Sequence, residues 1–308
     1  MNTNLPPLLC FVHVPKTGGT SVKTFLNGAS SGGIGQLDQR KCKLANAPFE
    51  QMIWATSHDP LPLWQAAVGN RREARYFASM REPKARIISS TNFSIHAWGR
   101  PDWVRPAKGN GAHWDAVRAA DWENPRDVRA VMIAAGSRFL NSLSDFLLST
   151  DADRNLPPPL RGEDEIATNL KAFDFVASFE TLPAMCRSFG FYSDDEFDAL
   201  DKGVFHQNSR PYKFDKAIFD DPLVADYLEE HLQPDQRVYK VAQRLFPEAP
   251  SNYVERRAFR NFDELPFDEK QYLDNNPDVA KAVADRSMPS GHFHYMHHGR
   301  AEGRLRYF

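Results

Sequence analysis

The feature that most constrains the fold lies near the N-terminus, where an apolar run leads through a glycine-containing loop into a helical pattern. Residues 8–14 are almost continuously apolar, which is typical of a strand buried on both faces of a parallel sheet. The run stops at Pro15. Residues 20–26 are typical of a helix start, with Thr20 or Ser21 available as the cap. The segment therefore predicts a strand, a loop and a helix in succession.

The same alternation returns further along the chain. We predict strands over residues 52–56, 76–80 and 173–179. The strand over residues 76–80 runs into Pro83, which suits the first turn of a helix. The strand over residues 173–179 precedes a predicted helix over residues 181–189. Strands that alternate with helices predict an α/β domain with a central parallel sheet, whose ligands collect at the carboxyl ends of the strands.

Other parts of the chain break this alternation. Residues 94–160 mix tryptophan, arginine and proline, which indicates an insertion of loops and helices. Residues 215–246 predict two helices broken near Pro234. A boundary near residue 250 divides the chain into a larger domain, 1–250, and a small helical module, 251–308.

Composition limits the classes of partner. The chain has 308 residues and a formal net charge of -2, so nothing global favours nucleic acid or a membrane surface. Its three cysteines are odd in number and widely spaced, which favours a reducing compartment over a disulfide framework. The sequence shows neither a leader peptide nor a membrane span. We therefore expect a cytoplasmic protein that binds anions through a local basic patch.

The loop after the first predicted strand has the chemistry of a phosphate site. Gly18 and Gly19 let backbone N–H groups approach an anion, and the following helix N-terminus adds donors and positive dipole. Lys16 precedes the glycines, whereas the Walker A motif places its lysine after them. The loop is thus a phosphate loop but a poor nucleoside-triphosphate motif.

Two motifs in this order resemble a known family. The segment Pro15-Lys16-Thr17-Gly18-Gly19-Thr20-Ser21 is similar to the 5′-phosphosulfate loop of sulfotransferases that use 3′-phosphoadenosine-5′-phosphosulfate (PAPS), especially the heparan sulfate and uronosyl 2-O-sulfotransferases. Arg81-Glu82-Pro83, followed by Arg86 and Ser89, is similar to their second signature. The resemblance implies a three-layer, P-loop-like sulfotransferase fold and transfer of a sulfuryl group from PAPS to a carbohydrate hydroxyl.

The resemblance also implies residue roles. Lys16 would contact the phosphosulfate, and the loop residues Thr17, Gly18, Gly19, Thr20 and Ser21 would hold its 5′ end. Arg81 and Ser89 would hold the 3′-phosphate, for which a planar guanidinium and a hydroxyl are apt donors. The plain alternative is that Arg81 pairs with a carboxylate and that the two glycines form a tight turn.

His58 is the candidate base. It follows a predicted strand and precedes Arg81 by 23 residues. In the similar enzymes a histidine after the equivalent strand, a little over twenty residues before the arginine motif, serves as the base, so the resemblance implies this role for His58. A histidine with a pKa of roughly 6.5 can accept a hydroxyl proton near neutral pH. Lys16 would stabilise charge on the leaving oxygen without a metal. Asp59 either orients His58 or, as the favoured interpretation, forms an Asp-Pro turn.

Two further segments are candidates for ligand contacts. By resemblance, a polar loop with Asn208, Ser209 and Arg210 would close over the nucleotide, although a solvated surface loop fits it equally well. The tryptophan and arginine residues from Trp98 to Trp114 suit either a sugar platform or, for most of the tryptophans, core packing.

The C-terminal segment carries two short patterns. They are Tyr272-Leu273 with Asn276-Pro277-Asp278, and His294-Tyr295 with Gly299 and Glu302-Gly303-Arg304. These patterns resemble helical modules appended to bacterial glycosyltransferases and polysaccharide-related proteins. Four histidines cluster here, but without a cysteine or a convincing partner set they predict no metal site: His292, His294, His297 and His298.

Two other functions stay open. A phosphate-loop nucleotide-dependent kinase would need a lysine after the glycines and an acidic magnesium ligand, neither of which is evident. A noncatalytic glycan-binding protein on the same scaffold is disfavoured by Lys16, His58 and Arg81. The identity of the acceptor does not follow from the fold.

Overall fold

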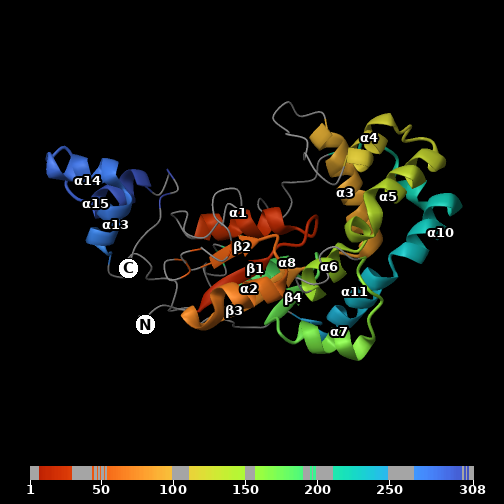
Figure 1. Cartoon of the computed structure of the whole chain (residues 1–308), viewed down its shortest axis with the longest axis horizontal. Coiled ribbons are helices and arrows are strands. Elements are labelled where there is room, and N and C mark those ends of the chain that lie inside the picture. The colour runs from red at the N-terminus through yellow and green to blue at the C-terminus, as the bar shows by residue number, and fades with distance from the viewer. Residues whose placement is uncertain are drawn as a thin grey trace.

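The structure is a computed structural model of the whole chain (Figure 1). It describes residues 7–29, 44, 47, 49, 52, 54–98, 111–149, 157–189, 195, 197–198, 211–248, 267–299, 302 and 304.

A four-stranded sheet forms the centre of the fold, in the order β2-β1-β3-β4. The strands are β1 (Leu8–Val12), β2 (Trp54–Ser57), β3 (Ala74–Ser79) and β4 (Phe175–Ala177), and every pairing is parallel. The predicted α/β class and parallel sheet are confirmed, and each strand end lies within two residues of its predicted place.

One face of the sheet is covered by α1 (Gly19–Ala29) and α8 (Leu182–Ser188). Leu9 and Phe11 of β1 point to this face, where they pack with Val22 and Phe25 of α1. Helix α1 begins at Gly19, ahead of the residues expected to cap it, since the N–H groups of Ser21 and Val22 both donate to the carbonyl of Gly18.

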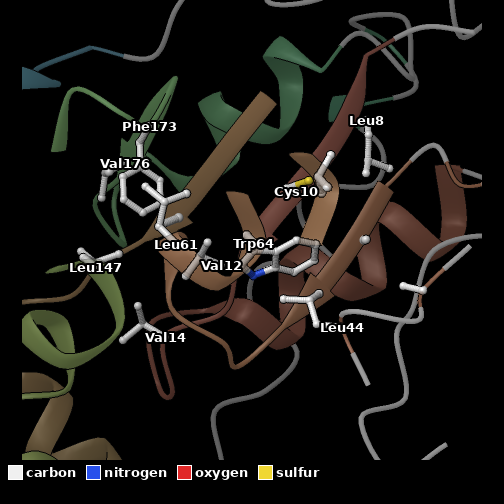
Figure 2. Packing of buried hydrophobic residues seen from close by; sticks show 14 of the residues in the cluster. Leu8, Cys10, Val12, Val14, Leu44, Leu61, Trp64, Leu147, Phe173 and Val176 are labelled. Atoms are coloured by element: carbon white, nitrogen blue, oxygen red, sulfur yellow. The ribbon is translucent and has the colours of Figure 1, made fainter. Parts of the chain in front are cut away.

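The alternate residues of β1 face the other way. Leu8, Cys10 and Val12 pack with Leu61 and Trp64 in the cluster that Figure 2 shows. The helices on this face are α2 (Leu61–Val68), α6 (Ser142–Leu148), α7 (Glu163–Leu170) and α11 (Gln233–Leu245). Both faces of β1 are therefore buried, which explains why its sequence is continuously apolar rather than alternating.

A helical subassembly adjoins the sheet (Figure 1). It contains α3 (Pro83–Trp98), α4 (Gly111–Ala119), α5 (Pro125–Leu140), η5 (Lys216–Asp220) and α10 (Pro222–His231), which share a third apolar cluster. The described part of residues 94–160 is mostly helical, with non-helical segments at 120–124 and 157–160, which agrees with the predicted mixture of loops and helices. Helices α10 and α11 separate at Leu232, so Pro234 lies in the first turn of α11, where its missing N–H costs nothing.

The C-terminal helices contact one another (Figure 1). They are α13 (Glu269–Asn275), α14 (Pro277–Ala284), α15 (Gly291–His294) and the π-helical turn η7 (Tyr295–Gly299). The buried Tyr272 hydroxyl lies 3.0 Å from Nδ1 of His294, and Arg304 bonds Asp278 through both terminal nitrogens. Their helical nature was predicted, and the division of the chain at residue 250 stays a prediction.

No helix in the described ranges is long and apolar enough to cross a membrane.

Candidate functional site

The loop after β1 lies at a reversal in the strand order. The chain passes from β1 to β2 on one side and from β3 to β4 on the other. In open parallel sheets, the crevice beyond the carboxyl ends of two such strands is the usual ligand site. The residues that follow β1 and β3, which include Lys16 and Arg81, therefore lie at the expected edge.

Residue 17 ties this loop to β3. The buried Thr17 hydroxyl donates to the carbonyl of Val14 at 2.8 Å, and it lies 2.8 Å from the Ser79 hydroxyl. Because Thr17 has one hydroxyl proton, Ser79 must donate in the second bond. The Thr17 side chain therefore holds the loop, and its contribution to an anion would come from its backbone N–H.

The backbone around Thr17 has an unusual shape. Lys16 has a φ of 68° and Gly18 a φ of 95°, both in the left-handed region. Such alternation turns successive N–H groups toward one side of a loop, as in anion-binding loops. For lysine this conformation is strained, and strain of this kind persists where the surrounding structure enforces it.

Both glycines are also required by their neighbours. A Cβ at Gly18 would lie 2.5 Å from Cδ2 of Leu182, and one at Gly19 would lie 2.1 Å from the His13 ring. From the sequence alone, we attribute Gly18 and Gly19 to an anion that approaches the backbone closely. The structure adds that protein side chains already occupy the space a Cβ would need.

Lys16 and Arg81 each lie over an aromatic ring at this edge. Lys16 Nζ is 4.4 Å from the centre of the Phe93 ring of α3, and the Arg81 guanidinium carbon is 4.7 Å from that of Phe179. Phe179 follows β4, is 38% exposed, and also adjoins Gly18. Phe179 thus lies beside both Gly18 and Arg81, and neither Lys16 nor Arg81 is buried.

The remaining predicted loop and signature residues have different surroundings. Thr20 is exposed and Ser21 is buried, both in the first turn of α1. Glu82 accepts hydrogen bonds from the N–H groups of Lys84 and Ala85 and so caps α3, while Ser89 is half-buried in the second turn of that helix. Asn208, Ser209 and Arg210 lie outside the described residues.

Arg86 is a structural residue rather than part of the site. Its side chain is 1% exposed, donates to the carbonyl of Phe139 at 2.8 Å, and lies 3.7 Å from the buried Asp235 carboxylate. Burial raises the Asp235 pKa to about 6, although Arg86 and two backbone N–H groups of α6 act in the opposite direction. Arg86 therefore ties α3 to α5 and α11 below the site.

His58 follows β2 and is held by a residue that follows β1. Its Nδ1 lies 2.7 Å from the carbonyl oxygen of His13, and the two imidazole rings stack with centroids 4.2 Å apart and planes at 29°. The edge of Phe146 lies nearby, with ring centroids 6.2 Å apart. The ring is packed by these neighbours, yet it still reaches solvent.

Charges and burial determine the protonation of the two histidines. Burial chiefly lowers the pKa of His58; Lys23 lowers it further, while the His13 carbonyl and Asp59 raise it. Burial, His58, Lys23 and Lys16 hold the pKa of His13 well below its usual range. Both rings are therefore neutral at pH 7, in spite of the chain's net negative charge.

Asp59 supports the turn. Its carboxylate accepts a hydrogen bond from the Ser57 hydroxyl at 2.7 Å, and its N–H donates to the same hydroxyl at 2.9 Å. Nδ1 of His58 is oriented instead by the hydrogen bond that it donates to the backbone carbonyl of His13. Asp59 acts on His58 through its charge.

Sequence reasoning missed His13. The residue belongs to the apolar run of the first strand, and nothing in its spacing relates it to residue 58. The sequence did contain a signal. A histidine in a segment predicted to be buried on both faces requires a hydrogen-bond partner.

The structure also places two of the tryptophans of residues 94–160. Trp114 is 6% exposed and Trp122 stacks on Phe214, which agrees with core packing. In the described residues, no group of three or more histidine, cysteine or acidic side chains could hold a metal ion.

Comparison of the sequence with protein-family models finds no match. Comparison with curated proteins finds none either.

Proposed function

We propose that this protein is a sulfotransferase that transfers a sulfuryl group from PAPS to a hydroxyl of a carbohydrate acceptor. The observation that carries the proposal is the arrangement of His58, whose Nδ1 is bound by a carbonyl at the same sheet edge as Lys16 and Arg81. The two ordered motifs that resemble PAPS-dependent enzymes supply the identity of the donor.

The hydrogen bond to His13 determines which nitrogen of His58 can act as a base. A carbonyl oxygen only accepts, so Nδ1 must carry the hydrogen. The neutral ring then has its lone pair on Nε2. Because its pKa is lowered, the ring is neutral at pH 7 and can accept the acceptor's hydroxyl proton. When it does so, the resulting positive charge is stabilised by the His13 carbonyl.

The cations and the loop supply the other half of the chemistry. The donor provides a sulfuryl group and leaves as adenosine 3′,5′-bisphosphate: an oxygen–sulfur bond forms with the acceptor, and the bond to the phosphate oxygen breaks. Lys16, together with the N–H groups at the start of α1, stabilises the negative charge that develops on the leaving oxygen. Arg81 carries the planar donor set suited to a second phosphate.

The cationic groups fit this donor better than they fit a nucleoside triphosphate. Lysine precedes the glycines, and a second cation, Arg81, stands beside the loop through Phe179. A PAPS molecule has anionic groups at both its 5′ and 3′ ends. Two separate cations, rather than one lysine with a metal, suit that distribution of charge.

The carbohydrate acceptor rests on resemblance, both of the two motifs and of the C-terminal segment. Trp114 is buried, and Trp122 is half-buried and stacks on Phe214.

The direct test is calorimetry with adenosine 3′,5′-bisphosphate and with ATP. We expect the bisphosphate to bind at least about tenfold more tightly, and Arg81→Gln to weaken its binding more than that of adenosine 5′-phosphate. A preference for ATP would contradict the donor assignment and favour the kinase alternative.

The base is tested separately with His58→Ala. Release of the bisphosphate from PAPS in the presence of a panel of glycans should fall by about 10²–10⁴-fold, while the Kd of the bisphosphate stays within about twofold. Unchanged turnover would remove His58 from the mechanism without affecting the donor assignment.

A further inference from the structure

His13 contacts the candidate base in two ways, and it also binds the residue before that base. Its N–H donates to the carbonyl of Ser57 at 2.9 Å, its carbonyl accepts from His58 Nδ1 at 2.7 Å, and its ring stacks on the His58 ring. Residue 13 therefore determines both the backbone position before His58 and the orientation of the His58 imidazole.

The same ring also contacts the segment of residues 15–21, which is proposed to bind the anionic donor and is called the anion loop below. The Cδ2–Nε2 edge of His13 occupies the space beside Gly19, where an added Cβ would come within 2.1 Å of both atoms. Gly19 is the first residue of α1, and the N–H groups at this end of the helix are the ones proposed to stabilise the leaving group. The ring is only 9% exposed, so it cannot itself reach an acceptor.

We infer that His13 is a positioning residue for the proposed reaction: its ring lies between Gly19 and His58 and maintains the spacing between the anion loop and the base. The inference rests on the proposed function for its catalytic meaning. Its physical part, the effect of one ring on the other, stands on the contacts alone.

The close stacking of His13 and His58 disfavours protonation of both rings at the same time. An imidazolium at His13 would repel a proton on His58 across 4.2 Å. The charged groups that act on the pair are Lys16 and Lys23, which disfavour protonation, and Asp59, which favours it at His58. Burial of His13 leaves the more exposed His58 as the ring that takes up the proton.

The decisive variant is His13→Ala, because it removes the ring while the carbonyl that binds His58 remains. We expect the His58 ring to gain solvent, so that its pKa rises toward the ordinary value; histidine NMR titration, with His58→Gln for assignment, measures this. We also expect kcat to fall by about tenfold or more, with the Kd of the bisphosphate changed by less than about threefold.

Two further variants separate positioning from packing. His13→Phe retains a flat ring and should keep kcat within about threefold of the parent protein. His113→Ala removes another buried imidazole, on α4 and outside the site, and should leave the His58 titration unchanged. Should His13→Ala not fold, Gly19→Ala displaces the same ring and is measured instead.

The inference is overturned if the His58 titration does not move in His13→Ala, or if kcat and bisphosphate affinity fall together, since the latter indicates collapse of the whole loop. Equal loss in the Phe and Ala variants would overturn it as well. Absence of bisphosphate binding in the parent protein would instead refute the proposed function, and the NMR titration would still decide the coupling of the two rings.

Discussion

The hydroxyl groups of Thr17 and Ser79 lie 2.8 Å apart and join the anion loop to the end of β3. Thr17→Val keeps the shape of the side chain but leaves Ser79 and the carbonyl of Val14 without their partner. We expect a loss of about 1–3 kcal/mol in the free energy of unfolding, measured by urea denaturation.

Thr168→Val is the matched control, because the exposed Thr168 hydroxyl also donates to a carbonyl, that of Asp164, at 2.8 Å. Water can replace that bond, so its loss should cost no more than about 0.5 kcal/mol. Equal costs at the two positions would show that the contact between Thr17 and Ser79 does not hold the loop.

Gly18 combines a positive φ with a crowded neighbour, whereas Gly136 has a φ of 78° and no atom within 4 Å of an added Cβ. Gly136→Ala should therefore cost only the backbone strain, about 1–3 kcal/mol. Gly18→Ala should cost more, because Leu182 must also shift. In a Leu182→Ala background, the added cost of Gly18→Ala should fall to that of Gly136→Ala.

Lys16 has a strained backbone conformation at the proposed site. Substitutions there should therefore distinguish the effect of its charge on ligand binding from the effect of its backbone conformation on stability. Lys16→Gly and Lys16→Ala both remove the ammonium and should weaken bisphosphate binding alike. The glycine variant should be more stable than the alanine variant by about 1 kcal/mol, since glycine adopts a φ of 68° without steric cost.

Arg286 offers the control for Lys16, with a φ of 63° on an exposed residue far along the chain. Arg286→Gly should gain a similar stability over Arg286→Ala, and both should bind the bisphosphate like the parent protein. If the two Lys16 variants unfold at the same urea concentration, the left-handed conformation stores no strain.

Most of the sheet was predictable from sequence, and the reason lies in β1. Leu8, Cys10 and Val12 pack on one face while Leu9 and Phe11 pack on the other, so the strand has no polar face to confuse its assignment. Helix α2 was not predicted, because it begins directly after Pro60 and its eight residues are short for a periodic pattern.

A candidate site could be proposed from the sequence where one segment carries the chemistry, as at Lys16 and Gly18. It was not predictable where the chemistry arises from contact between distant segments. The stacking of His13 on His58 joins residues 45 apart, and the burial of Arg86 depends on α5 and α11, which no local pattern relates to α3.

Arg86 tests this distinction, because its place in the second signature suggests a ligand contact while its burial indicates a structural one. Arg86→Leu leaves the buried Asp235 without its cation and should cost about 3–5 kcal/mol in the free energy of unfolding. Bisphosphate affinity of the folded fraction should not change.

Arg138→Leu is the comparison, since Arg138 pairs with Asp145 while 41% exposed and its loss should cost about 0–1 kcal/mol. Calorimetry below the unfolding temperature of Arg86→Leu measures its affinity for the bisphosphate. A large drop in this affinity would show that Arg86 belongs to the ligand site.

Two charges of opposite sign act on the pKa of His58, so removal of each should shift this pKa in the opposite direction. Lys23 lowers the His58 pKa and Asp59 raises it. In the parent protein the acid limb of kcat/KM should lie below the ordinary histidine pKa of about 6.5, because the proposed base loses activity only when Nε2 is protonated. Lys23→Gln should move this limb to higher pH.

Asp59→Asn should move the limb to lower pH, while the amide oxygen can still accept from the Ser57 hydroxyl and preserve the turn. NMR titration of His58 in both variants should show the same directions as the rate profile. A shift in the rate profile without a matching shift in the His58 titration would mean that another group accepts the proton. Shifts of the same sign in both variants would show that structural change, rather than charge, moves the His58 pKa.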